Sequence, residues 1–193
     1  MRRAREEDLP ALAPLLYSTA GDMYDRMAGS SERAVRVIVA DARRNGLAST
    51  WVAELDGVVA GAMVAYPYRD AAAHTRRFVS TLVRETPPWR WPSVAWLLWR
   101  GHRRAPAHPG KSLYVDALAT APEHQRRGVA TALLRHAERT AATAGLSAVA
   151  LDTPLTNAPA LALYESAGFQ VTESLPAKPP IPAGVTLVKE LAA

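Results

Sequence analysis

The sequence predicts a three-layer α+β protein, in which a mixed, mostly antiparallel central sheet carries helices on both faces and a helical insertion interrupts the chain. Two apolar runs flank Asp56-Gly57, a dipeptide that provides the positive φ angles of a tight hairpin turn. After Ser112, short apolar runs alternate with helical segments, which is typical of crossover connections. Hairpins and crossovers in one chain indicate a mixed sheet. The 193 residues are enough for one domain with a full core.

Periodicity and stop signals place the individual elements. Leucines at helical spacing predict a helix over residues 8–17, and a Ser-x-Glu opening before apolar residues predicts a second helix over residues 31–44. We expect hairpin strands from Thr50 onward and a further strand over residues 112–120. The remaining order is a helix at residues 129–144, a strand at 148–152, a helix at 158–167, and strands at 169–173 and 185–191.

We expect a single domain over residues 1–193, with a basic, Trp-rich insertion at about residues 69–110. From Arg69 to Lys111 the chain has nine Lys or Arg and two acids, a local charge of +7, whereas the rest of the chain has a net charge of −2. Four of the five tryptophans lie here: Trp89, Trp91, Trp96 and Trp99. The spacing of Val94, Leu97 and Leu98 predicts a helix pair whose tryptophans pack on the core. Nucleic-acid binding by this segment is the disfavoured alternative.

Composition excludes several functional classes. The chain has no cysteine, which excludes disulfides, thiolate metal sites and cysteinyl intermediates. Its first residues place acids directly after arginines, unlike a secretory signal, and the longest apolar run, Val94–Trp99, is far too short to cross a bilayer. No metal-ligand spacing links His74, His102 and His108, which we expect on the surface of the insertion. We therefore expect a cytoplasmic protein that binds neither a membrane nor a metal.

A strand, a turn and a helix start meet in residues 118–134. The free N–H groups of the first helical turn form an anion site, and the small residues Gly128 and Ala130 allow a phosphate to approach the backbone. Spacing alone leaves open whether this is a pyrophosphate site or an ordinary basic turn. Gly110-Lys111-Ser112 resembles the end of a P-loop, but the earlier glycine is missing and a strand follows.

A second pair of residues lies on the helix predicted at residues 158–167. Asn157 and Tyr164 are seven residues apart and therefore share one face. The simpler interpretation makes Asn157 the helix N-cap and Tyr164 a core residue.

Taken together, the two segments resemble a known family. Gln125-Arg-Arg-Gly-Val-Ala130 resembles the Q/R-x-x-G-x-G/A signature of the GNAT superfamily of acyl-CoA-dependent N-acyltransferases, and Asn157 followed by Leu163-Tyr-Glu-Ser-Ala-Gly-Phe169 resembles its C-terminal helix motif. The start of the chain is also similar, so the resemblance covers most of the sequence except about residues 69–110. It departs at Thr120, where the family usually has Val, and at Ala130, where a second Gly is commoner.

The resemblance implies that acetyl-CoA is the cosubstrate. The backbone at the end of the third strand would pair with the pantetheine arm, the amides of the following turn would hold the pyrophosphate, Asn157 would contact the arm, and the Tyr164 hydroxyl would lie near the sulfur. The implied binding residues are Leu118, Ala119, Thr120, Gln125, Arg126, Arg127, Gly128, Val129, Ala130, Thr131, Asn157 and Tyr164.

Acetyl transfer then suggests catalytic roles. The departing thiolate needs a proton, and Tyr164 is the candidate acid because a phenol (pKa about 10) is only about 1.5 units above a thiol (about 8.5). Asp116, two residues before Leu118 and so expected on the same strand face, is a candidate base. An ordinary hydrogen-bonded strand Asp is the alternative. Tyr114 shares that face and would line the cavity.

The function expected from the resemblance is an N-acetyltransferase that transfers an acetyl group from acetyl-CoA to a primary amine of a small molecule, by direct attack in a ternary complex. A non-catalytic acyl-CoA-binding regulatory module and a protein N-terminal or lysine acetyltransferase are the alternatives, and a homodimer is compatible with the sequence. If the arginines of the insertion faced the cleft, they would repel polyamines and favour an aromatic or carboxylate-bearing amine.

Overall fold

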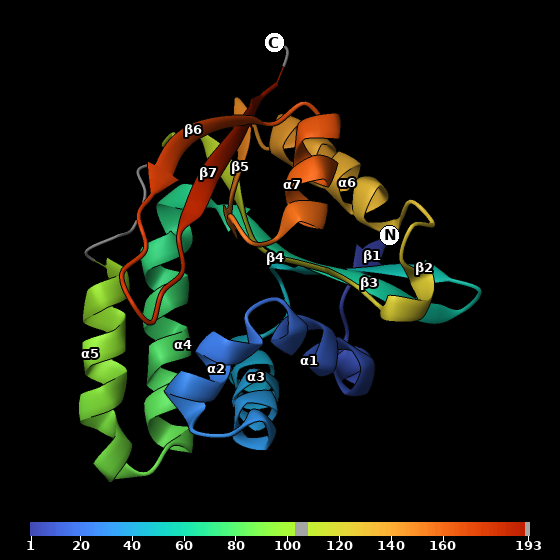
Figure 1. The fold of residues 1–193 in the computed structure, drawn as a ribbon. Helices are drawn as coiled ribbons and strands as arrows, with labels where there is room; N and C mark the ends of the chain where they lie inside the picture. The colour runs from blue at the N-terminus through green and yellow to red at the C-terminus, as the bar shows by residue number, and fades with distance from the viewer. Residues whose placement is uncertain (103–107, 192–193) are drawn as a thin grey trace.

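Seven strands form one sheet in the order β1-β2-β3-β4-β5-β7-β6 in the computed structural model, which describes residues 1–102 and 108–191 (Figure 1). The pair β4–β5 is parallel, and the other neighbouring pairs are antiparallel. The predicted mixed, mostly antiparallel sheet is therefore confirmed. The strands are β1 (Arg2–Arg3), β2 (Thr50–Leu55), β3 (Val58–Pro67), β4 (Ser112–Thr120), β5 (Ala148–Pro154), β6 (Gln170–Leu175) and β7 (Gly184–Glu190).

Helices cover both faces of the sheet, as expected. One apolar cluster packs α6 and α7 on the sheet, and a second packs α1 and α3 on the opposite face. The expected elements are present with ends that differ by one or two residues. The helices are α1 (Leu9–Ser18), α2 (Gly21–Ala28), α3 (Ser31–Asn45), α4 (Ala71–Glu85), α5 (Trp91–His102), α6 (Val129–Thr143) and α7 (Ala158–Ser166). Within the described ranges, no helix is long and apolar enough to span a bilayer.

The N-terminal region contains a helix that the sequence analysis missed. We expected two helices before the hairpin, but a short helix, α2, follows α1 along the chain and precedes α3 (Figure 1). Three of its residues, Met23, Tyr24 and Met27, line a cavity. A helix of two turns gives too little periodicity to be recognised from a single sequence.

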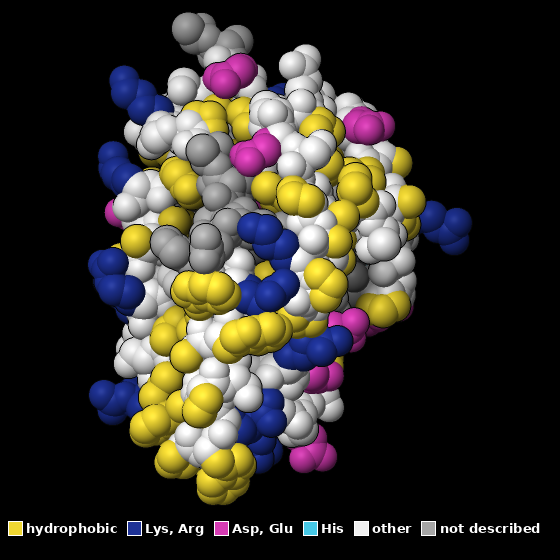
Figure 2. Space-filling view, turned by 60° about the vertical axis from the view of Figure 1, so that its left-hand side comes forward, with side chains coloured by type: hydrophobic (Ala, Val, Ile, Leu, Met, Phe, Trp, Pro, Cys, Tyr) yellow, Lys and Arg dark blue, Asp and Glu magenta, His cyan; other side chains and the backbone are white. Residues whose placement is uncertain are grey.

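The insertion contains α4 and α5, which stand side by side at one edge of the molecule (Figure 1). Val94 and Leu97 are buried in an apolar cluster together with Leu82 of α4, as the helix spacing predicted. The prediction that the tryptophans pack on the core is wrong, because their side chains are 44–79% exposed. The narrow buried edge of α5 is already filled by aliphatic side chains, so the larger rings project outward. Figure 2 shows apolar and basic side chains interspersed on a face of the molecule.

Candidate functional site

Two parallel strands separate at the centre of the sheet. The pairing of β4 with β5 runs from Ser112↔Ala148 to Val115↔Leu151 and ends there, whereas β4 continues to pair with β3 as far as Thr120. In the described part of the chain, residues 116–120 of β4 thus have no strand partner on the β5 side. Their backbone N–H and C=O groups can pair with an extended ligand, as at any exposed strand edge.

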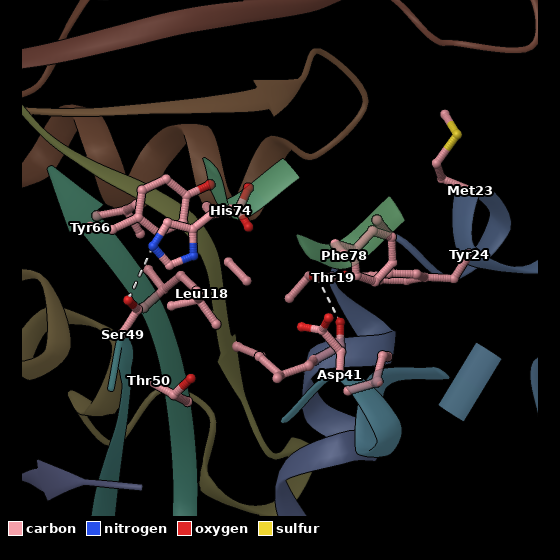
Figure 3. A pocket seen from close by; sticks show the side chains of 18 of the residues that line it. Thr19, Met23, Tyr24, Asp41, Ser49, Thr50, Tyr66, His74, Phe78 and Leu118 are labelled. Carbon is pink, nitrogen blue, oxygen red and sulfur yellow. Dashed lines mark hydrogen bonds between the residues drawn. The ribbon is translucent and has the colours of Figure 1, made fainter. Parts of the chain in front are cut away.

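A cavity of about 740 Å³ opens at this separation (Figure 3). Its wall is built from α1, α2, the end of α3, β3, α4, the second half of β4, the end of β5 and the start of α7. Among the catalytic and cofactor-binding residues suggested by the sequence, those that line it are Asp116, Leu118, Ala119, Thr120, Gln125, Asn157 and Tyr164. Two sequence segments about 40 residues apart thus meet at one site.

A β-bulge places Asp116 in the cavity. Val64 pairs with Ala117 and Ala65 pairs with Val115, so Asp116 is an extra residue opposite the β3 ladder. Such a bulge reverses the alternation of side chains. Val115 accordingly packs in the α6 cluster, whereas Ala117 packs in the α1 cluster on the other face.

The structure corrects two sequence-based expectations. Asp116 does not share a face with Leu118, because Leu118 packs against the α6 cluster whereas Asp116 interacts with Tyr66 and Tyr24 on the side of α1 to α4. Period-2 alternation fails at a bulge, and nothing in a single strand sequence marks one. Tyr114 does not line the cavity: its hydroxyl donates a hydrogen bond of 3.0 Å to Oδ2 of Asp152, which itself lines the cavity.

Asp116 has the electrostatic properties of a base. Its side chain reaches solvent through the cavity. The surrounding protein atoms nevertheless reduce the hydration of the carboxylate, and this desolvation raises its pKa to about 6. The interaction with the hydroxyl of Tyr66 lowers this pKa, and the charge of Asp152 raises it. A carboxylate with a pKa near neutrality accepts a proton at physiological pH more effectively than an ordinary surface aspartate.

Tyr164 reaches the cavity from α7. The side chain is buried against Phe169, with ring centroids 6.0 Å apart, and burial raises the pKa of the phenol to about 12. The hydroxyl therefore stays protonated at neutral pH. Asn157 forms the N-cap of the same helix, where its Oδ1 accepts a hydrogen bond of 3.3 Å from the amide of Ala160. The simpler interpretation of both residues thus holds, and both still line the cavity.

The turn before α6 has the geometry of an anion site. Arg126 and Gly128 both have positive φ angles, 58° and 80°, a type of turn conformation in which neighbouring backbone N–H groups can converge on an anion. Gly128 is the N-cap of α6, whose first turn contains no acid and receives no hydrogen bond from a capping side chain. A Cβ atom built on Gly128 would meet nothing within 4 Å, so the space in front of the helix is open.

A glycine on β3 brings this helix start onto the sheet. A Cβ atom on Gly61 would lie 2.7 Å from Cγ1 of Val129 and 2.8 Å from the carbonyl oxygen of Ala119. Real Cβ atoms essentially never approach that closely, so another residue here would push α6 away from β4. Gly61 was not recognised from the sequence because the contact is formed by segments far apart in the chain.

The sequence also missed part of the cavity wall. Tyr66 of β3 and His74 of α4 stack with ring centroids 3.9 Å apart, and His74 Nε2 lies 3.4 Å from the hydroxyl of Ser49 (Figure 3). We expected His74 on the surface, but it lies in the cavity wall.

The expectation that His108 lies on the surface is also wrong. Its side chain is only 2% exposed, and Nε2 lies 3.1 Å from Oδ2 of Asp152. Asp152 also accepts a hydrogen bond of 2.7 Å from the hydroxyl of Thr186. His102 is the third histidine that we expected on the surface, and its side chain lies outside the described part of the structure.

The family follows from comparison with known proteins. The profile of the acetyltransferase (GNAT) family matches residues 17–169, which is most of the chain. The chain belongs to the GNAT family. This result confirms the resemblance inferred from the two motifs, and it makes acyl transfer, with acetyl transfer as the general reaction of the family, the activity class of the chain.

Solved structures agree with this assignment at the level of the fold. An N-acetyltransferase from Staphylococcus aureus Mu50 aligns with a TM-score of 0.74 and 19% identity, covering 97% of this chain and 98% of that one. Ard1 from Thermoplasma volcanium aligns with a TM-score of 0.64 and 15% identity over 100% and 97%. An IAA acetyltransferase from Bacillus cereus ATCC 14579 aligns with a TM-score of 0.56 and 20% identity over 98% and 97%. No curated protein sequence matches this GNAT chain significantly.

Proposed function

We propose that this GNAT protein transfers an acetyl group from acetyl-CoA to a primary amine of a small molecule, by direct attack in a ternary complex. The observation that carries the proposal is that Asp116 and Tyr164, a base and an acid in electrostatic terms, line one cavity where β4 and β5 separate. The open anion site before α6 lies at the end of the same β4 segment.

The chain has the groups that acetyl-CoA requires. The unpaired edge of residues 116–120 would pair with the pantetheine amides, and the backbone N–H groups of residues 125–131 would hold the pyrophosphate at the start of α6. The hydroxyl of Thr120 is buried without a hydrogen-bond partner and faces this groove, as expected for a group that a ligand satisfies. Arg126 and Arg127 are exposed beside the turn and add positive charge.

Asp116 and Tyr164 then carry the proton transfers. Asp116 accepts a proton from the ammonium form of the acceptor, which frees the nitrogen lone pair to attack the thioester carbon. As the tetrahedral species collapses, the C–S bond breaks and Tyr164 donates its proton to the departing sulfur. The excess proton on the attacking nitrogen then restores the phenol of Tyr164, and Asp116 releases its proton to solvent, which leaves the amide and the free thiol. Burial raises the pKa of the phenol, and it raises the pKa of a thiol bound in the same cavity as well. The pKa difference between the two groups is therefore smaller than the difference between the buried phenol and a thiol in water.

The test is release of free thiol from acetyl-CoA in the presence of a panel of amines. We expect release that depends on the amine, and a loss of at least about 100-fold in a double variant, Asp116→Asn with Tyr164→Phe. Tyr17→Phe, outside the cavity, is the control for loss of a phenol. Acetyl-CoA binding without thiol release from any amine would identify a non-catalytic module. Turnover restricted to peptide amines would identify a protein acetyltransferase.

A further inference from the structure

The half of the cavity on the α2 and α4 side of Asp116 is walled by aromatic rings. Tyr66 and His74 stack on one side, and Tyr24 and Phe78 meet edge to face with ring centroids 6.1 Å apart on the other (Figure 3). These residues come from α2, β3 and α4, away from the anion site at α6. This half is where the acceptor of the proposed reaction would enter.

Two carboxylates face this aromatic space. Asp116 comes from the β4 bulge and Asp41 comes from α3, where its Oδ1 accepts a hydrogen bond of 2.6 Å from Asn45 Nδ2. Neither forms an ion pair with a Lys or Arg of the described residues. The pKa of Tyr24 is raised, mainly by burial and further by Asp116 and Asp41, so its ring lies within electrostatic reach of both carboxylates.

The described basic residues of the insertion form no ion pair with these carboxylates. Among them, Arg77 lines the cavity, and its side chain is exposed. The others do not line it: Arg69, Arg76, Arg84, Arg90, Arg100 and Lys111. Among the described basic residues, Arg77 alone meets the condition under which we expected the insertion to repel polyamines, and its exposed side chain is screened by solvent.

Given acetyl transfer as proposed above, we propose that the acceptor is a diamine or another primary amine with a second cationic group. Asp116 receives the amine that attacks, Asp41 receives the second cation, and Tyr24 and Phe78 enclose the carbon chain between them. Carboxylates that form no ion pair within the described part of the chain favour a cationic ligand, and ring faces add attraction for an ammonium group. The hydrogen bond from Asn45 holds the Asp41 carboxylate in place.

Three amines of equal chain length isolate the second charge: cadaverine, n-pentylamine and δ-aminovalerate, which end in an ammonium, a methyl and a carboxylate group. We expect kcat/KM for cadaverine to exceed that for n-pentylamine at least about tenfold and that for δ-aminovalerate by more, at low ionic strength. We expect the preference to shrink as salt is added. Equal or better use of n-pentylamine or δ-aminovalerate would overturn the proposal.

A pair of variants assigns the preference to Asp41. In Asp41→Asn, the ratio of kcat/KM for cadaverine to that for n-pentylamine is expected to fall at least about fivefold. Asp22→Asn removes the same charge from an exposed position of α2 outside the cavity and serves as the control. An unchanged ratio in Asp41→Asn, or the same fall in both variants, would overturn the role of Asp41.

Calorimetric binding of cadaverine separates this inference from the proposed function. Binding that Asp41→Asn weakens, without thiol release from acetyl-CoA, would support the cation site and remove the transferase proposal. Thiol release with no preference for the second cation would support the transferase and overturn the cation site.

Discussion

The hydroxyl of Tyr66 on β3 interacts with the carboxylate of Asp116, the bulge residue of β4, and lowers the pKa of that carboxyl. This interaction stabilises the ionised carboxylate and so opposes the effect of desolvation on its pKa. We expect Tyr66→Phe to raise the pKa of Asp116 further. If Asp116 is the base, the acidic limb of the kcat/KM profile, near pH 6 in the wild type, moves to higher pH. An acidic limb that stays in place in Tyr66→Phe, or persists in Asp116→Asn, would assign the base to another group.

The raised pKa of Asp116 also affects stability. A carboxyl group whose pKa is higher in the folded than in the unfolded state favours folding below the unfolded value, near 3.8, and this contribution is lost as pH rises through about 6. Asp116→Asn, which removes a poorly hydrated charge that solvent reaches through the cavity, should therefore raise Tm slightly at pH 8 relative to the wild type and have less effect at pH 4. Calorimetry at the two pH values checks this. A lower Tm at pH 8 would mean that the carboxylate stabilises the fold.

The anion site can be tested at Gly128. Asp and Asn have similar size and both tolerate the left-handed conformation with φ of 80° better than other residues. We expect Gly128→Asp to weaken acetyl-CoA binding at least about tenfold more than Gly128→Asn, because the added carboxylate repels the pyrophosphate. Isothermal calorimetry gives both affinities. Equal affinities in the two variants would place the pyrophosphate elsewhere.

Tyr164 separates binding from chemistry. Tyr164→Phe keeps the packing against Phe169 and removes the hydroxyl alone. We expect turnover to fall at least about tenfold while affinity for acetyl-CoA stays within a few fold, as for the loss of a proton donor. Steady-state kinetics together with a binding titration measure the two effects. Unchanged turnover would leave Tyr164 as a packing residue.

The insertion offers a stability test of what packs on the core. Leu97 is 5% exposed and lies in the cluster with Leu82, whereas Trp89 is 79% exposed. We expect Leu97→Ala to cost about 2–4 kcal/mol of unfolding free energy. Trp89→Ala should change it by no more than about 0.5 kcal/mol. Urea denaturation compares the two, and a larger loss in Trp89→Ala would show that the tryptophan packs on the protein in solution.

Local signals in the sequence determined much of this protein. The Asp56-Gly57 turn, helix starts such as Ser31 and stop glycines such as Gly145 act within a few residues, so their elements appear where the pattern indicates. The turn from Gln125 to Gly128 is also local, which is why its motif and its backbone geometry agree. Motif order then indicated the GNAT family, and the family profile confirmed it.

Contacts between distant segments decided the rest. The side on which Asp116 emerges depends on the register of β4 against β3, and the burial of His108 depends on Asp152, 44 residues away. Helical spacing showed that one edge of α5 would be buried but not which rings that edge could accommodate. The hydrophobic periodicity of a strand or helix can be read from its own sequence. The segment that covers each of its faces is determined only when the chain packs.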